Sequence, residues 1–171
     1  MTLNNNTIAD APPIIDLEAS GFGSTSYPIE VGVVMAGDAR YCQLIRPVPS
    51  WTHWDDSAEQ LHGISRQTLF EHGREPKEIV ANLNQLLGTS TVYTDAWVVD
   101  YPWLRTLSWA AQIDMTFRVS PLEGILSEAQ MEIWQTTRAQ VEAETKIPRH
   151  RASIDAQIIQ ATYEKTRLLV G

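Results

Sequence analysis

Short apolar runs and stretches with helical spacing alternate along most of this 171-residue chain. Apolar runs that end in turn residues predict strands, whereas apolar residues that recur every three or four positions predict amphipathic helices. Strands are expected at residues 12–17, 29–35, 41–47, 91–94 and 115–119. The second and third are separated by a short Ala-Gly-Asp-Ala segment at residues 36–39 and should form a hairpin.

Helical spacing begins at residue 55 and continues to residue 87, where Ser65 and Pro76 are suitable helix starts. Further helices are expected at residues 99–111, 127–145 and 152–169. Three leading strands followed by strands that alternate with helices predict an α/β fold, in which helices pack on a mixed sheet. We expect a flexible N-terminus at residues 1–11 and one domain at residues 12–171, because no linker or repeat interrupts the pattern.

Composition agrees with a globular protein, since 43% of the residues are hydrophobic and 20% are charged. No apolar stretch approaches a membrane span, and the polar N-terminal residues do not resemble a signal peptide. We therefore expect a cytoplasmic protein without a membrane partner. The single cysteine, Cys42, lies in a strand-like segment and is expected to be a small buried side chain.

The formal net charge of −8 argues against non-specific binding to long duplex DNA, which depends on many basic contacts to phosphates. Acidic residues that hold divalent cations would cancel part of this charge. The charge therefore favours short or single-stranded ends over duplex.

Two carboxylates, Asp16 and Glu18, follow the first apolar run and are two residues apart. On an extended chain both side chains point to the same side, where they could clamp a cation. Two like charges this close repel each other, so the pair is unfavourable without a metal ion. The alternative is a solvated acidic turn.

His150 and Asp155 lie five residues apart across the start of the last helix, so both can face the edge of the sheet. Asp100 opens another apolar helix, where a carboxylate could instead only complement the helix dipole. Carboxylate oxygens suit Mg²⁺ and Mn²⁺, and two such ions can stabilise an in-line phosphoryl displacement. With a histidine to accept a proton from water, the set is suited to phosphodiester hydrolysis.

The chain resembles the DEDDh exonucleases, which include proofreading subunits of bacterial replicative polymerases, ribonuclease T and oligoribonuclease. The first motif is IIDLEASGF at residues 14–22, followed by YPIEVG at 27–32. The third motif is HRASIDA at residues 150–156, and LHGIS at 61–65 resembles a segment near the substrate end. The second motif departs from the pattern, because the His-Asn that often precedes its aspartate is missing. Asp100 is the better match there, with Asp95 as a competitor.

The resemblance implies an RNase H-like fold of about five strands and a two-metal 3′→5′ exonuclease that releases nucleoside 5′-monophosphates from single-stranded 3′ ends. Asp16, Glu18 and Asp155 would hold one Mg²⁺ or Mn²⁺ ion. Asp16 would bridge to the second ion, on which Asp100 acts, and His150 would be the general base. The formation of a homodimer is left open as one possibility.

Four residues would bind the substrate by the same resemblance. Ala19, Ser20 and Phe22 lie in or after the first motif, where Phe22 would stack or wedge against the 3′-terminal base. His62 would contact sugar or phosphate. Most of the six tryptophans are expected to serve packing. Arg149 and Arg151 flank His150 and could contact phosphates, although surface arginines are common.

Two other functions remain open at this point. A metal-dependent hydrolase of short oligonucleotides or dinucleotides could use the same residues. A catalytically silent nucleic-acid-binding module could share the scaffold, but such a module could lose any of the five catalytic residues, and all five positions are filled.

Overall fold

The computed structural model describes residues 11–145 and 150–171 of the chain. The expected flexible N-terminus therefore lies outside the described residues, except for Ala11, which is buried. Arg149 lies outside them as well. Within the described ranges, no helix combines the length and the apolar character needed to cross a bilayer.

A five-stranded mixed sheet forms the centre of the molecule, with the strands in the order β3-β2-β1-β4-β5. β1 is antiparallel to β2 and β2 to β3, whereas β4 is parallel to both β1 and β5. The strands are β1 (Ile14–Ala19), β2 (Pro28–Val34), β3 (Arg40–Leu44), β4 (Thr91–Thr94) and β5 (Arg118–Pro121). The predicted α/β class, the mixed sheet and the leading hairpin are confirmed.

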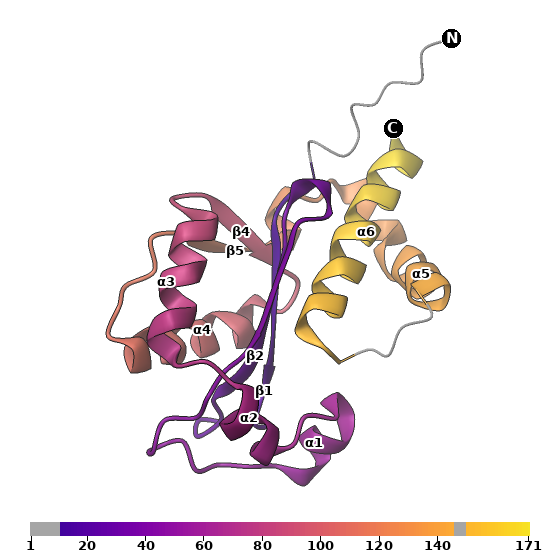
Figure 1. Cartoon of the computed structure of the whole chain (residues 1–171). Coiled ribbons are helices and arrows are strands. Elements are labelled where there is room, and N and C mark those ends of the chain that lie inside the picture. The colour runs from indigo at the N-terminus through magenta and orange to yellow at the C-terminus, as the bar shows by residue number, and fades with distance from the viewer. Residues whose placement is uncertain (1–10, 146–149) are drawn as a thin grey trace.

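Helices cover both faces of the sheet, with α3 and α4 on one side and α5 and α6 on the other (Figure 1). The α-helices are α1 (Asp56–His62), α2 (Arg66–His72), α3 (Pro76–Leu87), α4 (Trp97–Ala111), α5 (Glu128–Thr145) and α6 (Ala152–Val170). Two 3₁₀ turns, η1 (Ala36–Asp38) and η2 (Leu122–Ile125), complete the elements. The predicted helix starts are confirmed, since the Ser65 hydroxyl caps α2 and Pro76 is the first residue of α3.

The two sides of β1 contribute to two separate cores. Ile15 and Leu17 pack with residues of α3 and α4, including Leu83 and Leu104. Ile14, by contrast, packs with residues of α6. Because successive side chains of a strand point to opposite faces, the near-continuous apolar run of β1 is the pattern expected of a strand covered on both sides.

The start of α6 is fixed against β2 by two features. Gly32 lets the helix backbone approach closely, because a Cβ atom at this position would lie 2.2 Å from the backbone nitrogen of Ser153. The buried Glu30 carboxylate accepts hydrogen bonds from the Arg151 guanidinium, at 2.5 to 3.1 Å, and from the backbone N–H of Ala152 at 2.9 Å. Arg151 is therefore engaged in holding the helix end.

Two local predictions were wrong. The last strand begins at Arg118 rather than at residue 115, because Met115 and Phe117 pack against the core from the preceding loop. Met115 and Phe117 are therefore apolar because they pack against the core, not because they belong to a strand. Cys42 is exposed rather than buried, because β3 is an edge strand whose alternate side chains face solvent.

Candidate active site

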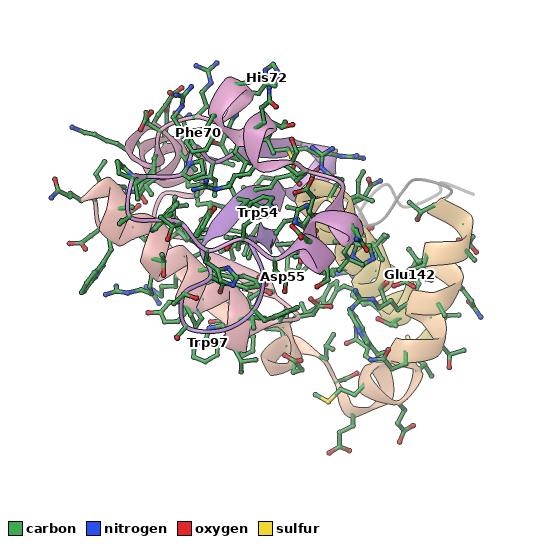
Figure 2. All side chains as sticks on the ribbon, turned by 90° about the horizontal axis from the view of Figure 1, so that it is seen from below. Trp54, Asp55, Phe70, His72, Trp97 and Glu142 are labelled. Atoms are coloured by element: carbon green, nitrogen blue, oxygen red, sulfur yellow. The ribbon has the colours of Figure 1, made fainter. Side chains whose placement is uncertain are left out.

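The carboxyl end of β1 and the amino end of α6 meet at one end of the molecule, the lower end in Figure 1. Figure 2 looks onto this end, where Trp54 and Asp55 lie near the centre of the view and Trp97 marks the start of α4. β1 lies between an antiparallel and a parallel neighbour, so its end is flanked by other elements on both sides. Ligands of open α/β sheets bind beyond such strand ends.

Three carboxylates converge at this end. Asp16 and Glu18 are half-buried on β1, and Asp155 is buried in the first turn of α6. One oxygen from each of the three lies within 4.8 Å of the others, so one cation could be held by all three. These are the residues that the sequence predicted as ligands of one ion.

Asp100 approaches from the third element, the first turn of α4, and is 1% exposed. Its carboxylate accepts a hydrogen bond from the Thr94 hydroxyl at the end of β4, and that hydroxyl in turn accepts from the Ala96 backbone N–H at 3.0 Å. Asp100 lines the same pocket as Asp16, whereas Asp95 is ion-paired with Arg138 and does not line it. The geometry favours Asp100 over Asp95.

Asp16, Glu18 and Asp100 have pKa values raised above those of ordinary carboxyl side chains. Burial is the largest cause of the raised pKa of Asp16, and the charges of Asp100, Glu18 and Asp155 add to it. Burial, followed by the charge of Asp155, raises the pKa of Glu18 to about 8. Burial also raises the pKa of Asp100 to about 7, against the Thr94 hydrogen bond, which lowers it.

This electrostatic strain fits a divalent cation. A bound cation would favour the ionised carboxylates that burial and mutual repulsion disfavour. The donors are all oxygen atoms, which are the ligands that Mg²⁺ and Mn²⁺ prefer.

A pocket of about 210 Å³ opens over the cluster. All five predicted catalytic residues line it, and so do three of the four predicted substrate contacts: Asp16, Glu18, Asp100, His150, Asp155, Ala19, Phe22 and His62. The structure thus brings together residues from the β1 end, α1, α4 and α6 that are up to 139 positions apart in the sequence, from Asp16 to Asp155.

His150 precedes α6, and its backbone has a left-handed φ of 64°, which is rare for a residue with a side chain. Its backbone N–H donates to Asp155 Oδ2 at 3.0 Å. Asp155 therefore fixes the loop that carries His150 while its carboxylate also faces Asp16. Strained backbone of this kind is common at functional sites.

Ser20 is the exception among the predicted substrate contacts. Its side chain is fully buried, accepts a hydrogen bond from the Tyr27 backbone N–H at 3.1 Å and is bonded to His53 Nδ1 at 3.1 Å. Ser20 does not line the pocket. The structure therefore gives the Ser20 side chain a role in fixing the loop after β1, and the expected contact of Ser20 with the terminal nucleotide stays a prediction.

His62 is 6% exposed at the wall of the pocket. Its Nδ1 accepts a hydrogen bond from the Ile64 backbone N–H at 3.0 Å, which assigns the ring proton to Nε2 in the neutral form. Burial lowers the pKa of His62 and so favours that neutral form. Among the described residues Nε2 makes no hydrogen bond of ordinary geometry, although the Ala19 backbone lies close enough to the ring to favour its protonated form.

Sequence reasoning missed some residues that shape the pocket. Trp103 lines it, with its ring centroid 6.2 Å from that of the exposed Phe22, and its indole N–H donates to the Ser26 hydroxyl at 2.9 Å. Trp103 lies one helical turn after Asp100, and this spacing could have predicted that both side chains face the same pocket. No sequence pattern indicated the roles of Thr94 and Glu30, because their hydrogen-bond partners lie on another element or far away in the sequence.

Comparisons with known proteins agree with this fold. No protein-family model and no curated protein sequence matches the chain. Among solved structures, Escherichia coli exonuclease I in complex with a dA16 oligonucleotide matches with a TM-score of 0.68 at 12% identity, over 91% of this chain and 40% of that one. The exonuclease I of Methylocaldum szegediense matches with a TM-score of 0.69 at 13% identity, over the same shares.

A zinc-bound form of the E. coli exonuclease I complex with single-stranded DNA also matches, with a TM-score of 0.69 at 14% identity over 91% of this chain. The chain thus spans about two fifths of the length of these proteins. At such identities the likeness shows the fold, and the predicted RNase H-like architecture is confirmed.

Proposed function

We propose that this protein is a divalent-cation-dependent 3′→5′ exonuclease that removes nucleoside 5′-monophosphates from single-stranded nucleic acid. The observation that carries the proposal is the convergence of Asp16, Glu18 and Asp155 within 4.8 Å in a pocket that also contains Asp100 and His150. The likeness in fold to exonuclease I structures solved with oligonucleotides supports it.

Asp16, Glu18 and Asp155 would hold one Mg²⁺ or Mn²⁺ ion, and Asp16 together with Asp100 would hold a second. When bound, the ions would stabilise the charge that develops on the attacking and leaving oxygens. The fixed positions of the carboxylates, on a central strand and two helix starts, mean that little reorganisation is needed for binding.

His150 would accept the proton of the attacking water. The water oxygen forms a bond to the phosphorus of the terminal phosphodiester, and the bond from that phosphorus to the 3′ oxygen of the preceding nucleotide breaks. The products are a nucleoside 5′-monophosphate and a strand shortened by one nucleotide with a free 3′ hydroxyl.

Phe22 and Trp103 would position the terminal base, because Phe22 is 73% exposed and the two rings lie side by side at the pocket. His62 would donate its Nε2 hydrogen to a sugar or phosphate oxygen of the same nucleotide. Backbone atoms of Ala19, which also lines the pocket, would complete this wall.

A panel of 3′-labelled substrates tests the proposal: single-stranded DNA, single-stranded RNA and duplex, each with Mg²⁺, Mn²⁺ or excess chelator. We expect labelled mononucleotide from a single-stranded substrate with a divalent ion and none with chelator or with Asp16→Asn. Undiminished release in chelator would contradict the proposal. A 3′-phosphate should slow release strongly.

Hydrolysis restricted to dinucleotides and other very short oligonucleotides is the second candidate, and the small volume of the pocket, about 210 Å³, is compatible with it. A series of substrate lengths separates the two. A rate constant that collapses beyond the shortest substrates would favour the second candidate, whereas one that holds or rises with length favours the exonuclease.

A further inference from the structure

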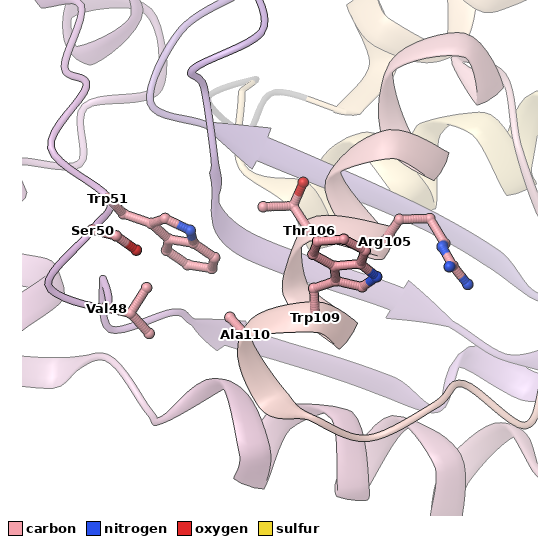
Figure 3. Close-up of a pocket in the computed structure, with 7 residues that line it drawn as sticks. All are labelled: Val48, Ser50, Trp51, Arg105, Thr106, Trp109 and Ala110. Atoms are coloured by element: carbon pink, nitrogen blue, oxygen red, sulfur yellow. The ribbon is translucent and has the colours of Figure 1, made fainter.

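A second hollow, larger than the active-site pocket, lies along α4. It has a volume of about 570 Å³ and separates α4 from the loop that follows β3. Figure 3 shows Trp51 on the loop side and Trp109 on the helix side, with Thr106 between them and Ala110 and Val48 below. We call this hollow the α4 groove.

Two indoles give the α4 groove walls suited to a flat, aromatic ligand. The Trp109 side chain is 79% exposed, which is unusual for the largest apolar side chain and leaves its ring free for stacking. Trp51 is half-buried and held in place, since it stacks on Tyr27 with centroids 5.0 Å apart and its carbonyl accepts from Arg66 at 2.8 Å.

The charge of the α4 groove differs from that of the whole chain. Among the residues that the structure describes, Arg105 is the only charged one that lines the groove and no carboxylate lines it, although the chain carries a net charge of −8. Within residues 11–145 and 150–171, no carboxylate forms an ion pair with Arg105. Figure 3 shows its guanidinium on the side of Trp109 away from Trp51, and Arg105 also lines a neighbouring hollow together with Asp114. The guanidinium is therefore available for an anion such as a phosphate at the edge of the groove.

The α4 groove and the active-site pocket are separate hollows that are both lined by α4, and Trp103 of the pocket shares one face of the helix with Thr106 and Ala110 of the groove. Asp100 and Trp103, at the start of α4, line the active-site pocket, and Arg105 and Trp109, further along α4, line the groove. Nine residues of helix from Asp100 to Trp109 correspond to about 14 Å. A stacked strand rises about 3.4 Å per nucleotide, so the far end of the groove is at least about four nucleotides from the reacting phosphate.

We propose that the α4 groove binds single-stranded nucleic acid a few nucleotides before the 3′ end, with a base against the indoles of Trp51 and Trp109 and a backbone phosphate at Arg105. Aromatic rings that stack bases beside a cation that contacts phosphate are the general means by which proteins hold single strands without reading sequence. The proposal rests on the proposed function, since it assigns the groove to the same substrate.

Binding and hydrolysis of labelled oligonucleotides of about three and about twelve nucleotides test this, because only the longer one would reach the groove by the spacing above. Binding is measured by fluorescence anisotropy in chelator, and hydrolysis with Mn²⁺. Loss of one stacked base corresponds to a factor of about 5 to 150 in affinity. Trp109→Ala should therefore raise the Kd for the long oligonucleotide by such a factor and leave the kcat/KM for the short one unchanged.

Arg105→Ala should weaken binding of the long oligonucleotide as well and reduce the dependence of its Kd on salt by about one phosphate contact. Matched controls remove an exposed apolar side chain and an exposed arginine elsewhere, as in Leu168→Ala and Arg40→Ala. These variants should bind both oligonucleotides like the wild type. Because Trp109 and Arg105 are at the surface, all variants should melt at similar temperatures.

The results separate the possible occupants. Changes below twofold for Trp109→Ala, or equal losses on short and long substrates, would overturn the groove assignment. So would a change in oligomeric state without a change in oligonucleotide binding, because the groove would then be a protein interface. If the wild type binds the long oligonucleotide through Trp109 and Arg105 but hydrolyses nothing, the proposed exonuclease activity fails while the groove assignment holds.

Discussion

At the scale of single residues, the raised pKa values of Asp16, Glu18 and Asp100 predict how pH acts on the metal-free protein. In the unfolded chain these carboxyls titrate near pH 4. Between about pH 4 and pH 8 the folded protein therefore binds more protons than the unfolded chain, and its free energy of unfolding falls as pH rises through this range. Thermal unfolding in chelator should show Tm decreasing from about pH 5 to about pH 8.

Mg²⁺ or Mn²⁺ should raise Tm more at about pH 8 than at about pH 5, because protons and cations compete for the same oxygens. Glu18→Gln supplies the control. It removes one of the repelling charges, so the metal-free variant should lose less stability with rising pH and gain less from added metal. A wild-type Tm that neither falls with pH nor responds to divalent ions would contradict the metal assignment.

Proton transfer and cation binding can be separated by two substitutions, His150→Asn and Asp155→Asn. Asparagine tolerates the left-handed backbone at position 150, and the hydrogen bond to Asp155 comes from the backbone N–H, so His150→Asn should keep the fold. We expect it to lower kcat by about 10²- to 10⁴-fold with metal affinity retained. Asp155→Asn should weaken metal binding in calorimetric titration. Near-normal kcat in His150→Asn would make His150 structural.

The tautomer of His62 predicts different values of kcat/KM for the substitutions His62→Gln and His62→Asn. An asparagine can reproduce the Nδ1 acceptor that holds the Ile64 N–H, and a glutamine can place a donor near Nε2. His62→Gln should therefore retain more kcat/KM than His62→Asn, which we expect to lose about tenfold, the worth of one substrate hydrogen bond. Equal kcat/KM in both variants at equal Tm would argue that Nε2 donates nothing to substrate.

The motif residues could be predicted from sequence because their spacing carries geometry. Alternation on a strand places Asp16 and Glu18 on one side, and five residues around a helix start place His150 near Asp155. Ser20 has a motif position too, but its side chain is hydrogen-bonded to His53, 33 residues away, and no local sequence pattern indicates this contact. The pairing of Glu30 with Arg151 joins residues 121 positions apart and was equally hidden.

At the scale of elements, the site depends on how closely α6 approaches β2. In Gly32→Ala the new Cβ would meet backbone atoms of Ala152 and Ser153 at 2.2 to 2.6 Å, and backbone cannot rotate away as a flexible side chain would. The start of α6 should shift and carry Asp155 away from Asp16. We expect a loss of about 1–3 kcal/mol or more in the free energy of unfolding and weaker metal binding.

Denaturant unfolding and metal titration check this prediction, with Gly124→Ala as the control, because a Cβ there meets nothing within 4 Å. A Gly32→Ala variant with unchanged stability and metal affinity would show that the contact can relax. The elements themselves were largely predictable, since their periodicity is local, whereas this close approach appears in the sequence only as a single glycine in a strand.

At the scale of the whole molecule, the sheet joins everything that the site needs. β1 contributes to both cores, and α4 and α6 bring Asp100 and Asp155 to its end from opposite faces. We propose that the described residues form one domain, for which a single unfolding transition seen by both fluorescence and circular dichroism is the test. Separate transitions for the two faces would contradict it.

The central claim is that this arrangement removes nucleotides one at a time from the 3′ end with the help of divalent ions. The most direct measurement is a time course on a 5′-labelled single-stranded oligonucleotide, resolved by gel electrophoresis with Mn²⁺, with chelator, and with Asp16→Asn. The account predicts a ladder that shortens from full length in single-nucleotide steps with Mn²⁺ alone. A ladder that persists in chelator, or a label released first as a short 5′ fragment, would contradict it.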